Sequence, residues 1–184
     1  MKHLMFLLEE PSTKKFLDEW LPKWLPEDIV FTTVPHEGKH DLQKSIPRKI
    51  RAMKNIPDIK FIIIHDQDSA DCIELKKQLQ VLCREAGCED VLIRIACHEL
   101  ESWFLGDLLA VERAFNENGL FEKHGQKSKF REPDKLNNAA QELKKIIPSY
   151  QKVNGARKIA AYISIERNRS LSFRRLYEGI NRMI

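Results

Sequence analysis

Two aspartates, one residue apart, follow an apolar run in the segment FIIIHDQDSAD, which spans residues 61–71. Asp66 and Asp68 are carboxylates, and carboxylates that are held close together repel one another at neutral pH. A protein tolerates that repulsion when a cation is bound among them, and oxygen ligands select hard cations such as Mg²⁺ or Mn²⁺. The spacing therefore indicates a metal site for phosphoryl chemistry, because such a cation can activate water and stabilise charge on a phosphoryl group.

A plainer interpretation is that these acids end a strand and cap the helix that follows. Asp68 and Asp71 are both suitable N-cap residues, and acids are favourable in the first turn of a helix. We favour the capping role for Asp71 and the metal role for Asp66 and Asp68. Trp103, further along the chain, is expected to be a core residue rather than a platform on which a base stacks.

Four apolar segments alternate with amphipathic ones along the first two thirds of the chain. We expect strands in the apolar segments, at residues 3–9, 28–35, 59–66 and 90–97. We expect helices at residues 10–26, 42–54, 73–86 and 99–115, with Pro47 either kinking the second helix or marking its start. This alternation predicts an α/β fold, in which a mainly parallel sheet of about four strands is covered by helices on both faces.

The pattern changes after residue 116. Residues 117–135 are polar and loop-like, and further helices are expected near residues 135–147, 155–163 and 170–183. We interpret residues 1–116 as the α/β core. Residues 117–184 are expected to form a loop and a helical C-terminal cap of the same domain, since 184 residues suit a single domain.

Acidic residues follow three of the four predicted strands: Glu9 the first, Asp66 and Asp68 the third, and Glu99 and Glu101 the fourth. Ligands bind outside the carboxyl ends of the strands in an open parallel sheet, so these five acids are the candidate catalytic residues. Residues two apart point to different sides of a regular helix, and we favour Glu99 over Glu101 because it lies nearer the strand. The alternative is that both glutamates stabilise a helix N-terminus.

Basic residues concentrate near the C-terminus, where residues 151–184 hold eight Lys or Arg and two Glu. A basic flank beside an acidic centre suits an enzyme that binds nucleic-acid phosphates with one and a metal with the other, and arginine forks match phosphate geometry. The candidate phosphate contacts are Lys39, Lys152, Arg157, Arg167, Arg169 and Arg174. A solvated basic helix, ion pairs within the domain and contacts with a protein partner remain open interpretations.

Other classes of site find less support. The chain has no GxxxxGK motif, so we do not expect it to hydrolyse ATP, and no Cys/His spacing supports a zinc site. The four cysteines form no CxxC pair, and the apolar stretch LMFLL is too short for a signal sequence or a membrane span. We expect a reduced, cytoplasmic protein with no membrane association.

The acids after the first and third predicted strands resemble the Toprim pattern of topoisomerases, primases and related nucleases. That pattern has a Glu at the end of its first strand and a DxD at the end of its third, which correspond here to Glu9 in LLEEPSTKKF and to Asp66 and Asp68 in IIIHDQD. The resemblance implies that these three residues bind Mg²⁺ for phosphoryl transfer on nucleic acid, and that Glu9 could act as general base or acid. Glu10 stands where the pattern commonly has Gly, so the geometry of that turn is expected to differ.

A resemblance to the DUF4276 family covers almost the whole chain. It is carried by the segments HEGKHDL, HDQDSADC, RIACHELESWFLGD, FREPD, NGARKIA and NRSLSFRRL, of which ELESWFLGD is the most specific. The resemblance implies a Toprim-like fold and, by analogy, a Mg²⁺- or Mn²⁺-dependent nuclease acting on DNA or RNA. It also implies an ABC/AAA-type ATPase partner in a bacterial defence setting.

Two other functions stay open at this point. One is a non-catalytic subunit that keeps the Toprim scaffold and docks on the ATPase, and the other is a small-molecule phosphatase. A homo-oligomer is also compatible with the sequence.

Overall fold

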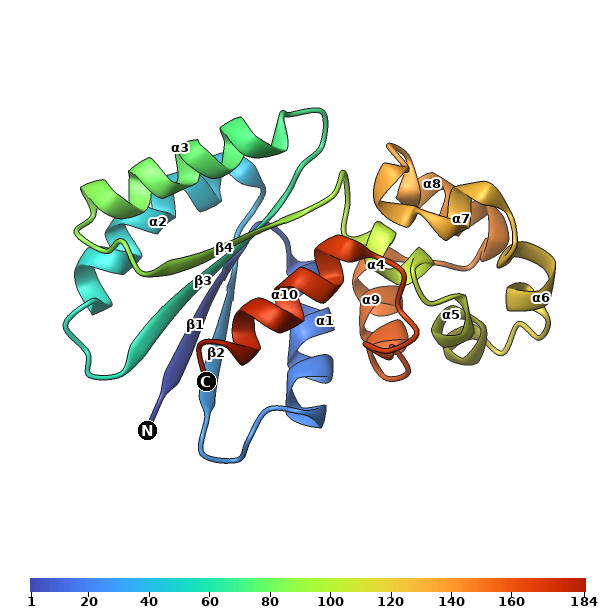
Figure 1. The fold of residues 1–184 in the computed structure, drawn as a ribbon, viewed down its shortest axis with the longest axis horizontal. Coiled ribbons are helices and arrows are strands. Elements are labelled where there is room, and N and C mark those ends of the chain that lie inside the picture. The colour runs from blue at the N-terminus through green and yellow to red at the C-terminus, as the bar shows by residue number, and fades with distance from the viewer.

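A computed structural model describes all residues, 1–184, and its centre is a four-stranded sheet (Figure 1). The strands are β1 (His3–Leu8), β2 (Val30–Pro35), β3 (Ile59–Asp66) and β4 (Val91–Ala96). Every pairing is parallel, and the order across the sheet is β2-β1-β3-β4. The α/β fold with a parallel sheet, predicted from the alternation of apolar and amphipathic segments, is confirmed.

Alternate residues of each strand enter two hydrophobic cores, one on each face of the sheet. In β1, Leu4, Phe6 and Leu8 enter the larger core, whereas Met5 and Leu7 enter the smaller one. Helices α2 (Lys39–Met53) and α3 (Cys72–Glu85) cover the smaller core (Figure 1). Helices α1 (Pro11–Trp20), α9 (Lys152–Ala160) and α10 (Leu171–Asn181) lie over the larger one. Both faces are therefore covered, as the continuous apolar strands require.

Two helix predictions need correction. The single helix expected at residues 99–115 is two helices, α4 (Glu101–Leu105) and α5 (Leu108–Phe115). They separate at Gly106, where a Cβ atom would lie 2.2 Å from Asn168 Oδ1, and Asp107 begins the new helix by accepting a hydrogen bond from the Ala110 amide. Pro47 lies inside α2 and does not mark its start.

The C-terminal part is more helical than its polar sequence indicates. Short turns η1 (Leu21–Lys23) and η2 (Pro133–Lys135) and helices α6 (Leu120–His124), α7 (Ser128–Arg131) and α8 (Ala139–Ile146) complete the chain. The larger core joins residues from both sides of residue 116, including Phe16, Trp103 and Phe173, whose rings pack together. Trp103 is fully buried, as predicted, and its indole N–H donates to Ser172 Oγ. No helix combines the length and apolarity that a membrane crossing demands.

Candidate active site at the carboxyl ends of β1 and β3

The strand order reverses between β1 and β3, because the chain adds β2 on one side of β1 and β3 and β4 on the other. Open α/β sheets bind ligands in the crevice at such a switch point. Glu9 directly follows β1, and Asp66 is the last residue of β3. Glu9 Oε2 accepts a hydrogen bond from the Asp66 backbone N–H at 2.8 Å, so one carboxylate ties the two strand ends together.

Glu9 forms a buried ion pair with His65. Glu9 Oε2 lies 2.8 Å from His65 Nδ1, and both side chains are almost wholly inaccessible to solvent. Burial acts to raise the pKa of Glu9, but the hydrogen bond and charge of His65 outweigh it and hold that pKa below its ordinary value. Burial acts to lower the pKa of His65, and Glu9 outweighs it in the same way, so the pKa of the imidazole is raised. Both groups therefore favour their charged forms.

Asp66 is in the opposite situation. It is 6 % exposed, and its carboxylate has no hydrogen bond or ion pair within the chain. Burial raises the pKa of Asp66 well above its ordinary value, and the carboxylates of Glu9, Glu10 and Glu101 raise it further, whereas Lys152 lowers it. Its charged form is therefore costly until an additional positive charge is nearby.

Glu101 supplies a second poorly satisfied carboxylate. It is fully buried at the start of α4, and its Oε1 accepts a hydrogen bond from the Tyr150 hydroxyl at 2.9 Å. Its Oε2 is buried without any partner. Burial raises the pKa of Glu101, while Lys152 and the Tyr150 hydroxyl oppose that effect. Buried polar atoms are rarely left unpaired, so this oxygen is a candidate ligand atom.

Lys152, at the start of α9, reaches toward this acidic group. Its Nζ lies 2.6 Å from Glu10 Oε2. Burial acts to lower the pKa of Lys152, but the hydrogen bond to Glu10 and the charges of Glu10, Glu101 and Asp66 raise it overall. One lysine therefore faces three carboxylates, and the group formed by Glu9, Glu10, Asp66, Glu101 and Lys152, which we call the acidic cluster, keeps a surplus of negative charge.

Two glycines allow this arrangement. Gly155 packs against the Tyr150 ring, where a Cβ atom would lie 2.3 Å from a ring carbon, so α9 can approach Glu101 closely. Gly38, with a φ of 94°, turns the chain after β2, and its N–H donates to the Glu9 carbonyl at 3.0 Å. That turn brings the first residue of α2, the exposed Lys39, to the same edge of the sheet as Glu9.

The other predicted acids lie around the acidic cluster rather than in it. Asp68 is exposed in a loop with a φ of 52°, and its N–H donates to the His98 carbonyl at 2.8 Å. Glu99 Oε2 accepts from the Ala140 N–H at 2.8 Å and so stabilises the first turn of α8. Asp71 caps α3 by accepting from two backbone N–H groups, which confirms the role expected for it.

The donor set agrees with a hard divalent cation, since it consists of carboxylate oxygens and includes one buried oxygen with no partner. Glu9 uses only Oε2 in its bonds to His65 and Asp66, which leaves Oε1 free to accept. The positions are not those of a formed metal site, because no three His, Cys, Asp or Glu side chains converge closely enough to hold an ion. The residues present thus suit the cation chemically.

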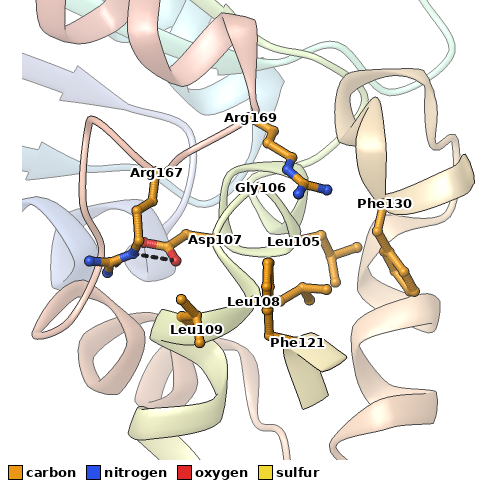
Figure 2. A pocket seen from close by; sticks show the side chains of 9 residues that line it. All are labelled: Leu105, Gly106, Asp107, Leu108, Leu109, Phe121, Phe130, Arg167 and Arg169. Carbon is orange, nitrogen blue, oxygen red and sulfur yellow. Dashed lines mark hydrogen bonds and ion pairs between the residues drawn. The ribbon is translucent and has the colours of Figure 1, made fainter. Parts of the chain in front are cut away.

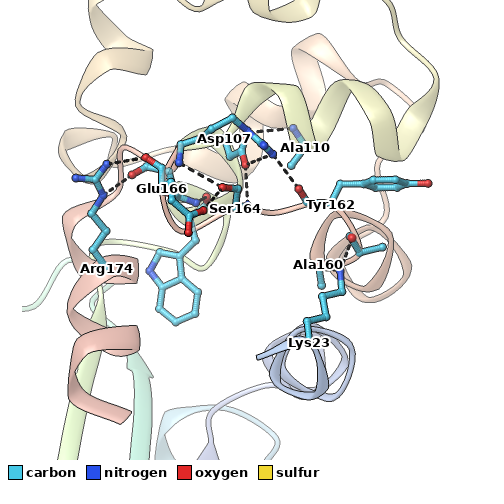
Figure 3. Close-up of polar contacts among 12 residues, drawn as sticks. Lys23, Asp107, Ala110, Ala160, Tyr162, Ser164, Glu166 and Arg174 are labelled. Carbon is cyan, nitrogen blue, oxygen red and sulfur yellow. Dashed lines mark hydrogen bonds and ion pairs between the residues drawn. The ribbon is translucent and has the colours of Figure 1, made fainter. Parts of the chain in front are cut away.

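Three of the predicted phosphate-binding arginines serve internal contacts. The guanidinium of Arg167 pairs with the buried carboxylate of Asp107 at 3.0 Å (Figures 2 and 3). Arg169 Nη1 donates to the Gly125 carbonyl at 2.7 Å, and Arg174 Nε donates to the Asn168 carbonyl at 2.6 Å. These bonds hold the segment before α10 against α4 and α5.

Of the remaining basic candidates, Lys152 is the one that the structure brings into the acidic cluster. Arg157 is exposed on α9 without a partner. Figure 2 shows Arg167 and Arg169 at a separate cavity of about 220 Å³, with Leu105, Phe121 and Phe130. In Figure 3 the Arg167–Asp107 pair joins Ser164 and Tyr162 in one polar network, while Lys23 donates to the Ala160 carbonyl at the end of α9.

Sequence reasoning missed His65, Glu10 and Tyr150 as members or neighbours of the site. For His65 a signal existed, because it follows Phe61 and Ile63 at the two-residue spacing that turns alternate strand residues to one face. For Tyr150 no local signal exists, since it lies 49 residues from Glu101 in the chain.

Comparisons with known proteins identify the family. No curated protein and no solved structure matches the chain. A family model described as "Domain of unknown function (DUF4276)" matches residues 8–181, which span the whole sheet and nearly all of the helices. The chain belongs to the DUF4276 family.

Proposed function

We propose that the protein is a Mg²⁺- or Mn²⁺-dependent nuclease of the Toprim type that cleaves phosphodiester bonds in DNA or RNA. The observation that carries this proposal is the acidic cluster at the switch point of the sheet, with Asp66 unpaired and one Glu101 oxygen buried without a partner. A fold that needed these acids only for stability would pair or expose them.

In this proposal Glu9, Asp66 and Asp68 hold the cation, and Glu101 supports it from the base of the site. When bound, such a cation supplies an activated water and offsets charge on the phosphoryl group. His65 keeps Glu9 ionised and oriented, so that Glu9 Oε1 can accept a proton from a nucleophile or return one to a leaving group. Lys152 contributes a positive charge that can follow the phosphate.

The test is cleavage of end-labelled single-stranded DNA, duplex DNA and tRNA with Mn²⁺ and with EDTA. Asp66→Asn and Glu9→Gln proteins are expected to lose metal-dependent cleavage while staying folded by circular dichroism. Asp71→Asn is the matched control, because Asp71 caps α3 outside the acidic cluster. Full metal-dependent cleavage by the Asp66→Asn protein would falsify the proposed role of the cluster.

A second function is favoured by one observation: no three acidic side chains converge to hold an ion, and a lysine already lies among them. The chain would then be a non-catalytic subunit that docks on a partner ATPase. Mn²⁺ separates the two proposals, because a ligand that binds only the folded state raises the melting temperature. A docking subunit should show no stabilisation by Mn²⁺, whereas the nuclease should show stabilisation that disappears in the Asp66→Asn protein.

We further propose a cytoplasmic location and an ABC/AAA-type ATPase partner within a bacterial defence system. The location is supported by four free cysteines, which a reducing compartment preserves. The partner is supported by the need to restrain a nuclease that could damage the host's own nucleic acid. Co-purification of an ATPase with the tagged chain, lost at high salt, is the corresponding test.

A further inference from the structure

A groove with a volume of about 910 Å³ runs along the free edge of β4. β4 is the last strand of the sheet, with α3 on one side and α10 on the other (Figure 1). The groove is lined by residues of α3, β4 and α10 and by the segment at residues 131–135. Its volume lies at the upper end of the range of about 300–1,000 Å³ for small-molecule sites, so it has room for an extended ligand.

Positive charge dominates this groove. Of its 20 lining residues, eight are Lys or Arg and three are Asp or Glu. Four of the basic residues, on three different elements, are exposed and make no ion pair or side-chain hydrogen bond within the protein: Lys76, Arg131, Arg175 and Arg182. Arg167 and Arg174, by contrast, are engaged in internal bonds. The groove therefore has cationic groups that are free to bind an anion.

The arginines along β4 are also close to one another. Arg94 Nε donates to the Arg175 carbonyl at 2.9 Å. A Cβ atom on Gly179 would lie 2.5 Å from Arg94 Nη2, so this glycine lets the guanidinium lie flat on α10. Burial lowers the pKa of Arg94, and the charges of Arg182 and Arg175 lower it further, with Glu178 opposing them. Guanidinium groups that repel one another in this way favour a polyanion as ligand.

A protein strand is a poorer occupant of the groove. Arg94 Nη1 donates to the Ile93 carbonyl at 2.9 Å and so occupies an acceptor that an added strand would need. No aromatic side chain lines the groove, which also removes the usual platform for stacking bases. What remains is recognition of a phosphate backbone by charge.

One end of the groove reaches the candidate active site. Cys97, which directly follows β4, lines the groove, and its neighbour Ala96 pairs in register with Asp66. Adjacent strands lie about 4.8 Å apart, so the groove ends roughly one strand spacing from Asp66. The Asp68 N–H bonds to the His98 carbonyl, so the loop that carries the second aspartate lies at the same opening.

We propose that this groove, between α3, β4 and α10, binds the sugar–phosphate backbone of a nucleic-acid strand and leads it to the acidic cluster. The inference deepens the proposed function, on which its catalytic meaning rests. It assigns substrate binding chiefly to Lys76, Arg131, Arg175 and Arg182. Binding is expected to show little sequence preference and a steep dependence on salt, because counterions are released from the phosphates.

The experiment measures the anisotropy of fluorescein-labelled single-stranded DNA and of RNA of the same sequence, in EDTA, so that no cleavage is required. The test protein is Arg175→Glu/Arg182→Glu. The matched control is Arg48→Glu/Lys144→Glu, which makes the same change in charge at exposed positions of α2 and α8. Lys76→Glu/Arg131→Glu provides a second test on other walls of the groove.

We expect each groove variant to weaken binding at least about tenfold, and each lost phosphate contact to reduce the slope of log K against log salt by about 1. The control should bind within about twofold of the wild type, as expected for charges outside the contact surface. Equal losses in the groove and control proteins would overturn the proposal. So would competition by poly-glutamate as effective as that by nucleic acid, which would indicate an acidic protein partner.

The two proposals can fail independently. Groove-dependent binding without any cleavage in Mn²⁺ would support the groove and refute the nuclease. Cleavage that is unaffected by the groove substitutions would support the nuclease and refute the groove. Comparison of the DNA and RNA affinities then identifies which nucleic acid the groove prefers.

Discussion

Replacing Asp66 by Asn should make the protein more stable at neutral and alkaline pH, although it removes a proposed catalytic residue. Asp66 is buried, unpaired and surrounded by other carboxylates, so its pKa in the folded state lies well above the ordinary value of 3.8. The folded state therefore holds a proton that the unfolded state releases. The stability contributed by this group is complete below its unfolded pKa and is lost as the pH rises through the folded pKa. Asn keeps the shape and carries no charge.

The size of the effect follows from the burial of an unsatisfied polar group, which costs about 1–3 kcal/mol and more when the group is charged. For a chain of this length each kcal/mol corresponds to about 2–4 °C in Tm. In EDTA, the Asp66→Asn protein should thus melt several degrees above the wild type at about pH 8, and the difference should shrink toward about pH 4, where the wild-type carboxyl is protonated as well.

The assay is a series of thermal melts followed by circular dichroism across this pH range, with and without Mn²⁺. Mn²⁺ at about 100 times its Kd should add about 2.7 kcal/mol to the wild type and nothing to the variant. A variant that is less stable than the wild type at every pH would refute the reasoning, because Asp66 would then be making a stabilising contact that the structure does not contain.

Other substitutions probe the remaining contacts. Glu9→Gln should destabilise the fold by about 3–5 kcal/mol in urea titrations at neutral pH, because it leaves a buried imidazolium unpaired, and the loss should vanish as acid protonates Glu9 in the wild type. Arg167→Ala should cost about 1–3 kcal/mol by the same measurement, since Asp107 stays buried without its partner. Gly155→Ala should lower Tm and increase fluorescence quenching of Tyr150 by acrylamide, because its Cβ atom displaces that ring. An unchanged Tm in any of these three proteins would contradict the corresponding contact.

The apolar strands and their order of appearance could be predicted because each strand is a local, almost uninterrupted apolar run. The position of Glu9 and Asp66 at one edge follows from the same pattern, since parallel strands bring their carboxyl ends together. Their different electrostatic states could not be predicted. Glu9 meets His65 on a neighbouring strand, whereas Asp66 meets no cation of its own, and that difference arises only when the sheet is assembled.

The helix from 99 to 115 was wrong for a related reason. Its periodicity is helical throughout, but Asn168 packs where a Cβ at position 106 would stand and donates to the Trp103 carbonyl. A contact across more than sixty residues thus ends a helix that local propensity would continue. The same break turns Glu101 into the interior, whereas Glu99, which we had favoured, bonds to the backbone of α8.

Two concentrations of like charge lie at the same edge of the sheet, and the fold does not use one to neutralise the other. Lys152 alone enters the acidic cluster, and Glu178 alone opposes the three arginines near β4, although both groups lie within a few residues of the strand ends. A sequence under selection for stability alone would interleave these charges, since like-charge contacts cost free energy in both places. Keeping them apart makes sense if the missing counter-charges arrive from outside as a cation and a polyanion. A phosphodiester that bridges the two, with its phosphate facing the acidic cluster through a metal and its flanking backbone along β4, would relieve both repulsions at once. For this reason, Mn²⁺ and nucleic acid should bind with positive coupling, and a Kd for nucleic acid that is unchanged by Mn²⁺ in a cleavage-deficient Glu9→Gln protein would argue against a shared site.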